Sequence, residues 1–448
     1  MQSFLFQKFK NNKNRPAIIW QDKEYTYSWL VQRISHYESI ISKTLPQGAI
    51  VGLKGDFNPE TIATFFALVS LGIIIIPLTE VFFSKNPGII ELAELEWMIE
   101  ADKIFNTGKK SYHKLYESIK NQKHSGLVVF SSGSTGEIKG IVHDLFLFEQ
   151  KFKKERTSFR AINFLLFDHL GGINTMYSIL SQGGCLLTLS TKNPDEVLSQ
   201  IEKHKIELLP TTPTFLNMVL LTEGYKRHNL SSLKVITYGT ENMQESILKR
   251  LNVLLPHVHF QQTYGLSEVG ILRSKSESSN SLFVKLGGAE FQTRVVDGEM
   301  QIKSDYLMLG YLNAPSPFTQ DGWFKTGDQV EVKGEYLKIL GRTSDLINVG
   351  GQKVFPAEVE SLLMNLKGVL DVTVYSEKNP LIGQILCVRV KLSTKEMRGD
   401  FTKRMRKELS GILEEYKMPM KVEVVEEIVS NDRLKKVRRF ATDTRSSS

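Results

Sequence analysis

Short apolar segments alternate with amphipathic segments along most of this chain, from about residue 15 to residue 340. The apolar run IVGL at residues 50–53, for example, is followed by PETIATFFA at residues 59–67, which has the spacing of a helix with a buried face. Buried strands that alternate with helices are typical of layered α/β domains. We therefore predict a large N-terminal domain of layered α/β subdomains.

The stretch from Leu282 to about Ile339 differs from the part before it, because it is richer in strand-forming residues. It contains the pairs Asp297-Gly298 and Lys333-Gly334, which are typical of tight turns between strands. We expect a strand-rich subdomain here, as the last part of the large domain.

A small polar break, GRTSD at residues 341–345, separates this region from about one hundred further residues. The later part has segments typical of strands at residues 372–375 and 384–390, and of a helix at residues 357–363. A small α+β domain with its own core is the expected result. We predict a large domain at residues 1–341, a small mobile C-terminal domain at residues 342–440 with its hinge at Ser344, and a disordered tail at residues 441–448.

Composition excludes several classes of protein. With 448 residues, of which 41% are hydrophobic and 24% charged, the chain has the makeup of a globular protein with a large core. The longest apolar run, at residues 65–77, is shorter than a membrane span and is interrupted by Gly72 and Pro77. The first residues lack the apolar segment of a secretory signal, so we expect a cytoplasmic protein without a membrane span.

Cysteine content and net charge bear on metals and partners. Cys185 and Cys387 are far apart in sequence and both lie in apolar surroundings, which predicts buried reduced thiols and no structural metal. The net charge is +8, but the lysines are scattered and no zinc-finger, RRM or basic-zipper pattern is found. Anionic small molecules account for the charge as well, and we predict no nucleic-acid partner.

The segment that follows the apolar strand LVVF at residues 127–130 is rich in hydroxyl groups and glycine. Glycines let backbone N–H groups face an anion, hydroxyls add donors, and a lysine supplies a compact positive charge. We expect this loop to hold the phosphates of a nucleotide triphosphate through Ser131, Ser132, Gly133, Ser134, Thr135, Gly136 and Lys139. Its spacing is not that of a P-loop, and a flexible Ser/Gly surface loop is the alternative, so other segments must decide.

Four further segments, taken with this loop, resemble motifs of the adenylate-forming superfamily of acyl-CoA synthetases, amino-acid-adenylating domains and luciferases. The resemblance spans nearly the whole chain. YGLSE at residues 264–268 is similar to the family's YGxTE motif, with Ser267 in place of threonine. The resemblance implies that Tyr264 and Gly265 border the adenine, that Ser267 contacts phosphate, and that Glu268 helps to hold Mg²⁺. An aromatic face, a hydroxyl and a hard carboxylate suit these roles.

Two other segments resemble the family's nucleotide-binding motifs. GWFKTGD at residues 322–328 is similar to GWxxTGD, whose aspartate accepts hydrogen bonds from both ribose hydroxyls, so Asp328 is the implied ribose ligand. Arg342 would lie against the nucleotide, since a guanidinium presents several fixed donors. The remaining matches are Gly239, Thr240 and Glu241 at the adenine pocket, and Glu299, Gly310 and Tyr311 in the family's GEl…GY segment. Five motifs in the family's order argue against coincidence.

The C-terminal part carries two more matches. Gly350 and Gly351 lie in a segment similar to the hairpin that lines the pantetheine tunnel of CoA ligases, where glycine leaves room for a thin thiol arm. The basic run RLKKVRR at residues 433–439 aligns with the family's TxxGKIxR segment and implies that Lys436 is the catalytic lysine, which bridges the carboxylate and the α-phosphate. Lys435 stands where the family has glycine, and Ser344 stands where its hinge has Asp or Lys.

The acyl pocket is expected at LLFDHLGGIN, residues 165–174, which resembles the PLFHxxG segment of acyl- and aryl-CoA ligases. This resemblance implies that His169 and Gly172 belong to the pocket, with His169 as a gate or wall. A second register would equate Asp168 with the aspartate that binds the substrate amine in amino-acid-activating domains. That register displaces Gly183 and Gly184 by two residues, so we prefer an acyl or aryl substrate.

The resemblance implies a reaction in two steps. A carboxylate attacks the α-phosphorus of Mg·ATP to give acyl-AMP and pyrophosphate, and after rotation of the small domain a thiol attacks the mixed anhydride. We predict an AMP-forming acid–thiol ligase of the acyl-CoA synthetase type, with ATP, Mg²⁺ and a small carboxylic acid. CoA or the phosphopantetheine of a separate acyl carrier protein is the acceptor. A nucleotide-binding relative without turnover, suggested by Ser344 and Lys435, is the alternative from another class.

Overall fold

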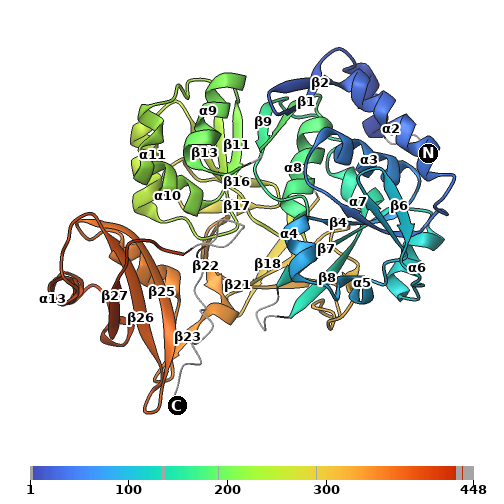
Figure 1. The fold of residues 1–448 in the computed structure, drawn as a ribbon. Coiled ribbons are helices and arrows are strands. Elements are labelled where there is room, and N and C mark those ends of the chain that lie inside the picture. Colours follow the sequence, from blue (N-terminus) through green and yellow to red (C-terminus); the bar gives the residue numbers. More distant parts are fainter. Residues whose placement is uncertain (1–3, 133–136, 190, 289, 430–435, 437–448) are drawn as a thin grey trace, which may run out of the picture.

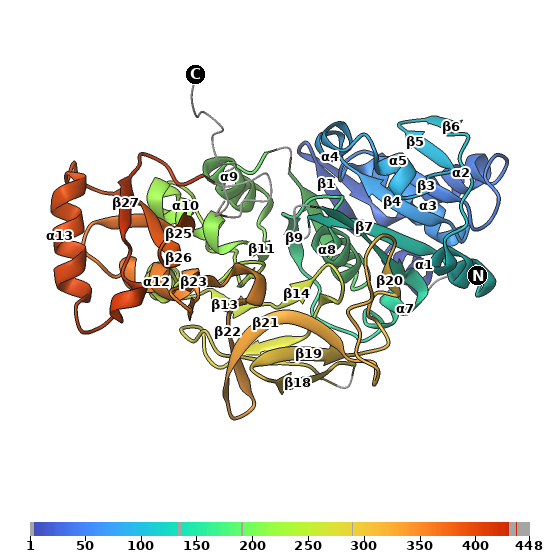
Figure 2. The same cartoon turned by 90° about the horizontal axis from the view of Figure 1, so that it is seen from below.

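The computed structural model describes residues 4–132, 137–189, 191–288, 290–429 and 436. It has a large N-terminal domain and a smaller C-terminal domain beside it, as predicted (Figure 1). Two seven-stranded sheets, here called sheets I and II, form most of the large domain, and a six-stranded sheet III completes it. Figure 2 shows sheet III below the other two, and the C-terminal domain to one side.

Sheet I has the strand order β13-β12-β11-β9-β10-β1-β2, and its neighbouring strands are parallel except for the pair β1 and β2. The strands are β1 Pro16–Trp20, β2 Lys23–Thr26, β9 Arg160–Asn163, β10 Cys185–Thr188, β11 Leu208–Thr211, β12 Val235–Tyr238 and β13 His259–Gln262. Helices connect the parallel strands, because such strands need long crossovers. These helices are α8 Leu170–Leu180, α9 Pro194–His204, α10 Pro213–Thr222 and α11 Glu245–Leu254, with the short η1 Gly224–Lys226 after α10.

Sheet II has the strand order β20-β8-β7-β4-β3-β5-β6, with parallel pairs in the middle and antiparallel pairs at both edges. The strands are β3 Ile50–Lys54, β4 Ile74–Leu78, β5 Trp97–Glu100, β6 Lys103–Asn106, β7 Gly126–Ser132, β8 Ile138–Asp144 and β20 Gly310–Tyr311. The helices of this half are α1 Phe4–Asn11, α2 Tyr27–Ile41, α3 Pro59–Ser70, α4 Glu80–Lys85, α5 Ile89–Leu92, α6 Lys114–Asn121 and α7 Leu145–Gln150.

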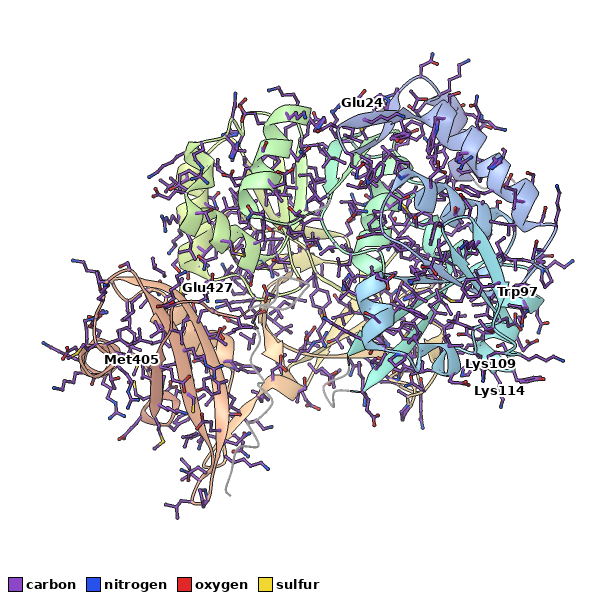
Figure 3. All side chains as sticks on the ribbon, in the orientation of Figure 1. Glu24, Trp97, Lys109, Lys114, Met405 and Glu427 are labelled. Atoms are coloured by element: carbon purple, nitrogen blue, oxygen red, sulfur yellow. The ribbon has the colours of Figure 1, made fainter. Side chains whose placement is uncertain are left out.

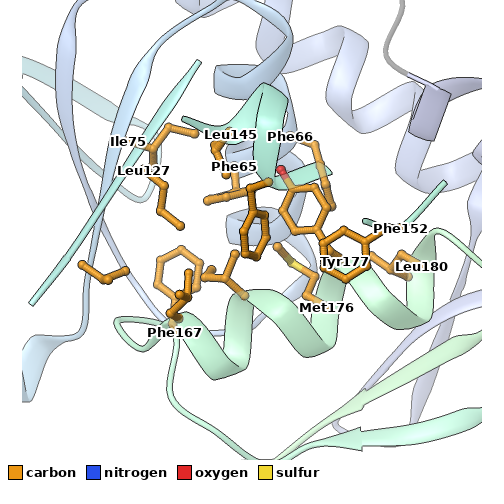
Figure 4. Close-up of a cluster of buried hydrophobic side chains, with 14 of the residues drawn as sticks. Phe65, Phe66, Ile75, Leu127, Leu145, Phe152, Phe167, Met176, Tyr177 and Leu180 are labelled. Carbon is orange, nitrogen blue, oxygen red and sulfur yellow. The ribbon is translucent and has the colours of Figure 1, made fainter. Parts of the chain in front are cut away.

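Sheets I and II form five layers with their helices, because each of these two sheets is covered by helices on both faces. Buried side chains of α1, α2, α3 and α8 form one cluster with side chains from both sheets, and aromatic rings dominate its centre (Figure 4). Helices α9, α10 and α11 cover the other face of sheet I, and α5 and α6 cover the other face of sheet II. The resulting order is α/β/α/β/α, which confirms the layered α/β prediction.

The long apolar run at residues 65–77 lies in this core. It forms the end of α3 and most of β4, and all of its residues from Phe65 to Leu68 are buried. The helix begins where Asn58 Oδ1 accepts the N–H of Thr61 and Pro59 occupies the first turn, which are strong helix-start signals. Within the described residues, no helix combines the length and the apolar character that crossing a bilayer requires.

Sheet III is antiparallel and has the order β16-β17-β22-β21-β19-β18. All of its strands except β16, which precedes Leu282, lie in or extend from the stretch that was predicted to be rich in strands. Its strands are β16 Ser274–Ser276, β17 Val284–Leu286, β18 Gln292–Val296, β19 Glu299–Lys303, β21 Phe324–Lys333 and β22 Tyr336–Arg342. The predicted turn at Asp297 and Gly298 joins β18 to β19, and both residues have positive φ, of 51° and 76°. A two-stranded ribbon, β14 Gly265–Leu266 and β15 Gly270–Ile271, lies between sheets I and III in sequence.

The described part of the C-terminal domain contains sheet IV, two α-helices and a short 3₁₀ helix. Sheet IV has the order β24-β23-β26-β25, with β27 parallel to β26. Its elements are β23 Ile347–Val349, β24 Gln352–Val354, α12 Pro356–Leu363, β25 Val369–Asn379, β26 Gly383–Leu392, α13 Arg398–Leu409, η3 Glu415–Lys417 and β27 Lys421–Val424. The two predicted strands form one hairpin, β25 and β26, and the predicted helix precedes both of them and packs on β25.

The chain passes from sheet III to sheet IV through a single short 3₁₀ turn, η2 Thr343–Asp345. The C-terminal domain has a hydrophobic cluster of its own, which includes Met405 of α13. Figure 3 shows Met405 at the end of this domain farthest from the large domain, and Glu427 on the side that faces the large domain. Cys185 in β10 and Cys387 in β26 are buried and free, as predicted.

Candidate active site

A cleft of about 1900 Å³ lies at the carboxyl ends of the parallel strands of sheet I. Thr211, Gly239 and Thr263 line it, and each lies at or directly after the end of β11, β12 or β13. The ribbon of β14 and β15 and the ends of β21 and β22 complete the wall. In α/β sheets the ligand crevice forms at this edge, because the loops after adjacent parallel strands diverge there.

Asp328 is the centre of a buried polar group on one wall of the cleft. Its Oδ2 accepts a hydrogen bond from the Tyr264 hydroxyl at 2.5 Å, and its Oδ1 lies 3.3 Å from Nε of Arg342. Asp328 and Arg342 are paired residues of β21 and β22, so the strand register brings them together. Burial raises the pKa of Asp328, while Arg342 and the Tyr264 hydroxyl act in the opposite direction.

The adenine-loop residues Gly239, Thr240 and Glu241 also line the cleft. A Cβ on Gly239 would lie 2.6 Å from the carbonyl oxygen of Thr263, so the close approach of these two segments requires glycine. Thr240 has a φ of 70°, which is unusual for a β-branched residue. Glu241 is held by Thr214, whose hydroxyl donates to its Oε2 at 2.6 Å.

Ser267 and Glu268 lie in the loop between β14 and β15, and contacts to sheet II fix this loop. The Tyr311 hydroxyl in β20 donates to Glu268 Oε1 at 2.9 Å, and the Met308 N–H donates to the Glu268 carbonyl at 2.8 Å. His143 in β8 donates from Nε2 to the Ser267 carbonyl at 2.7 Å. These hydrogen bonds therefore fix the position of the loop relative to sheet II.

His143 was not singled out in the sequence, where it is one residue of an apolar strand. It is almost fully buried, and burial lowers its pKa from 6.5 to about 4, with the positive charge of Lys151 acting in the same direction and the bond to the Ser267 carbonyl opposing. The folded protein thus holds His143 as a neutral Nε2–H imidazole that positions the Ser267 loop.

We expect His143 to make the folded protein sensitive to mild acid. An unfolded histidine binds a proton near pH 6.5 but the folded one only near pH 4, so stability falls as the pH drops between these values, by about 2 kcal/mol over two pH units. In His143→Gln, whose amide N–H₂ can donate to Ser267, the loss between pH 6.5 and 4.5 should be smaller by this amount in denaturant unfolding. His36→Gln, at an exposed position of α2, is the control, and equal pH dependence in all three proteins would contradict the assignment.

The structure describes two of the side chains that were predicted to hold phosphate, those of Ser131 and Lys139. Ser131 at the end of β7 and Lys139 in β8 are cross-strand partners, and both line the cleft. The Lys139 ammonium lies 5.2 Å from the centre of the Tyr311 ring, whose hydroxyl bonds Glu268. The side chain of Ser132 and the residues Gly133, Ser134, Thr135 and Gly136 lie outside the described residues.

Lys436 joins the two domains. Its backbone N–H donates to Glu241 Oε1 at 2.7 Å, so the residue lies against the adenine loop and lines the cleft. Its ammonium turns back to the C-terminal domain, where it pairs with Asp371 Oδ1 at 2.6 Å and donates to the Val372 carbonyl at 2.8 Å. Asp371 was not recognised in the sequence, because nothing in a strand such as LDVTVY marks an ion-pair partner 65 residues away.

The predicted acyl segment is divided between the cleft and the core. His169 lines the cleft and caps α8, since its Nδ1 accepts the N–H of Gly171 at 3.1 Å. Gly172 is not among the cleft-lining residues: a Cβ there would lie 2.3 Å from the Leu166 carbonyl oxygen, so this glycine serves close packing. Asp168 accepts a hydrogen bond from Thr79 at 2.7 Å, which ties the segment to the end of β4.

The remaining predicted residues lie in or near the C-terminal domain. Ser344 is in η2 and lines the cleft. Gly350 and Gly351 form the exposed turn between β23 and β24 and are not among the cleft-lining residues. Both have positive φ, of 57° and 88°, as a tight hairpin turn requires.

The described residues contain no group of three or more His, Cys, Asp or Glu side chains that could form a metal site by themselves. Glu268 is the cleft carboxylate that was predicted to hold Mg²⁺. A single hard carboxylate fits a nucleotide-bound Mg²⁺, because that ion commonly takes its other ligands from water and the phosphates.

Comparison with known proteins gives a consistent result along the chain. A family model described as AMP-binding enzyme matches residues 85–312, and a second, described as AMP-binding enzyme C-terminal domain, matches residues 358–435. Indoleacetate–CoA ligase from Aromatoleum aromaticum is 24% identical to this chain, with 92% of both sequences aligned. 2-Succinylbenzoate–CoA ligase from Bacillus pumilus is 26% identical, with 78% of this chain and 79% of the relative aligned. The acyl-CoA ligase AFT1-1 from Alternaria alternata is 27% identical, and this chain spans 59% of its length.

Solved structures share the fold over almost the whole chain. ATP-bound MatB from Rhodopseudomonas palustris matches with a TM-score of 0.81 at 20% identity, covering 97% of both chains. The o-succinylbenzoate CoA synthetase MenE from Bacillus subtilis, in complex with its acyl-adenylate intermediate, matches with a TM-score of 0.78 at 20% identity, covering 99% of both chains. The fold similarity to these solved structures therefore covers both domains of this chain.

Proposed function

Because this chain belongs to the AMP-binding enzyme family, we propose that it joins a carboxylic acid to a pantetheine thiol in an ATP-dependent reaction that passes through an acyl adenylate. One observation carries the proposal. Asp328 with Tyr264 and Arg342, and Glu268 with Tyr311 and Lys139, form two polar groups that line the same cleft.

The first group has the chemistry to bind a nucleoside. Asp328 would accept hydrogen bonds from the two ribose hydroxyls, and Arg342 would keep it ionised despite its burial. Tyr264 would contribute its ring face to the adenine, next to Gly265 and the loop of Gly239, Thr240 and Glu241.

The second group has the chemistry to bind a triphosphate. Lys139 would pair with the phosphates together with the hydroxyl of Ser131 and the loop that follows it. Ser267 would contact the α-phosphate, and Glu268 would hold Mg²⁺ with ATP, an ion that neutralises phosphate charge during the transfer. Glu268 accepts the Tyr311 hydroxyl on Oε1, and its carboxylate has further acceptor capacity for this role.

Lys436 would stabilise the first step by bridging the acid carboxylate and the α-phosphate as negative charge is redistributed. To do so its ammonium must leave Asp371 and turn into the cleft, which its backbone already borders. After adenylation the C-terminal domain, which we place at residues 342–440, would rotate about Ser344 and withdraw Lys436. The same rotation would bring Gly350 and Gly351 to the cleft, where their bare backbone suits a pantetheine tunnel.

CoA is the acceptor that we favour. Indoleacetate–CoA ligase and 2-succinylbenzoate–CoA ligase, which align with most of this chain, carry CoA in their names. A phosphopantetheinyl carrier protein would present the same thiol arm and is the alternative outcome of the test.

The test is exchange of labelled pyrophosphate into ATP, measured with fatty, aryl, amino and dicarboxylic acids. Exchange that depends on one acid class is expected, because adenylation is reversible when the acyl-AMP stays bound. For the acids that support exchange, CoA or a holo carrier protein is then added, and thioester and AMP are quantified. Binding of ATP without exchange for any acid would refute the enzyme proposal and leave a nucleotide-binding relative.

A further inference from the structure

Lys151 is a buried cation on the wall of the cleft. It follows the last residue of α7, its residue is 5% exposed, and it lines the cleft. Its ammonium lies over the ring centres of Phe148, at 4.0 Å, and Phe152, at 4.9 Å. Among the described residues its Nζ has neither a hydrogen-bond acceptor nor an ion-pair partner. Such a group costs free energy unless something binds it.

The space around this ammonium depends on a glycine. Gly270, the first residue of β15, has a φ of 71°, and a Cβ there would lie 2.8 Å from Lys151 Nζ and 3.9 Å from Leu170 of α8. The Lys151 ammonium thus lies beside the strand that follows Glu268, at a point where Leu170 of the proposed acyl segment also approaches this strand. The Phe152 ring, which lies under this ammonium, stacks on Tyr177 at 5.6 Å in the apolar cluster of Figure 4.

Positive charge prevails around Lys151. The positive charge of Arg156 lowers the pKa of Lys151, and the negative charge of Glu290 raises it. The positive charge of Arg273 lowers the pKa of Arg156 in the same way. All four residues line the cleft, and three of these four are cationic. Burial, with Arg156, lowers the pKa of Lys151 to about 7, so the unliganded protein holds this ammonium at a cost.

We propose that the acid activated by this chain carries a second anionic group, and that Lys151 binds it as the specificity-determining residue for a dicarboxylic acid. The inference rests on the proposed adenylation function. One carboxylate reacts with ATP, and the other forms a charge-assisted hydrogen bond with the ammonium near Gly270, where no group of the described chain does so. Arg156 and Arg273 attract the dianion to the cleft.

Acid pairs of matched size test the proposal in pyrophosphate exchange. Succinate is compared with butyrate, glutarate with valerate, and a phthalate isomer with the matching toluate, and each diacid also with its monomethyl ester. The unmodified protein should favour at least one diacid over its uncharged partner by about 30-fold or more in kcat/KM, which is typical for a buried charge pair. Lys151→Met should remove this preference through KM for the acid, while Lys154→Met, at an exposed cleft position, should retain it.

The outcomes separate the inference from the proposed function. No exchange with any acid would overturn the proposed function. Exchange with monocarboxylic acids that matches or exceeds that with diacids, unchanged in Lys151→Met, would overturn the inference and leave the proposed function intact.

A thermal-unfolding measurement provides a readout that does not depend on turnover. Without ligand, Lys151→Met should melt at a higher temperature than the unmodified protein at pH 6, because the variant no longer buries an unpaired charge. The difference should narrow as the pH approaches 10, where an unfolded lysine also begins to lose its proton. The preferred diacid should raise the melting temperature of the unmodified protein and of Lys154→Met, but not of Lys151→Met. A diacid that stabilises Lys151→Met equally would overturn the assignment.

Discussion

Lys436→Ala is expected to lower the rate of pyrophosphate exchange by about 100- to 1000-fold, the usual loss when a transition-state charge partner is removed. Lys436 lies against Glu241 of the adenine loop and lines the cleft, although its ammonium pairs with Asp371 in this conformation. Thioester formation from a preformed acyl adenylate and CoA should change by no more than a few-fold, because Lys436 is proposed to be withdrawn in that step. The two half-reactions are measured separately on the same preparation.

Lys435→Ala is the matched control for this prediction. It removes the same charge one residue earlier in the basic run, at a position outside the described residues, and exchange should stay within a few-fold of the unmodified rate. Melting temperatures close to that of the unmodified protein would show that both variants fold. The reverse pattern, with Lys435→Ala inactive and Lys436→Ala active, would move the catalytic lysine by one residue.

Asp328→Ala is expected to raise the KM for ATP by about 100-fold or more, because two hydrogen bonds from ribose to a carboxylate are lost, at about 1.5–3 kcal/mol each. Asp328 also accepts the Tyr264 hydroxyl and pairs with Arg342, so loss of these contacts contributes to the effect. Deoxynucleotides isolate the ribose contribution. The unmodified protein should use 2′-deoxy-ATP and 3′-deoxy-ATP about tenfold less well than ATP, and Asp328→Ala should treat all three nucleotides alike.

Asp321→Ala controls for removal of a carboxylate from the same segment. Asp321 pairs with Arg294 and does not line the cleft, so the KM for ATP should be unchanged. If Asp328→Ala continued to discriminate against the deoxynucleotides as strongly as the unmodified protein, Asp328 would not be the ribose ligand.

The fold class and the family could be predicted from sequence because both depend on local patterns. Apolar runs such as residues 65–77 must be buried wherever they occur, and they alternate with helix signals such as Asn58 and Pro59. The nucleotide motifs combine residues that lie within a few positions of one another, as in residues 264–268, and the family they indicate is confirmed by the two matching family models.

The roles of individual residues were less predictable. A resemblance to a family motif places a residue along the chain, but it does not show whether the residue lines the cleft or packs in the core. Gly172 was predicted in the acyl pocket, but it packs against the Leu166 carbonyl instead of lining the cleft. Gly350 and Gly351 lie away from the cleft in this conformation, and their proposed role depends on a domain rotation. The sequence does not indicate that Lys151 is buried or lines the cleft, because the run EQKFKKE at residues 149–155 resembles a solvated charged segment.

The sequence by itself determined the layered α/β architecture and the family, because these follow from periodicity and from short contiguous segments. Only the tertiary structure decided which charged side chains contact one another. Asp328 pairs with Arg342 through strand register, and Lys436 bonds to Glu241 of the large domain and to Asp371 of the C-terminal domain. Lys151 is buried beside Gly270. Burial and charge pairing depend on groups far apart in the chain, and their free energies are set by an environment that forms only when the layers pack.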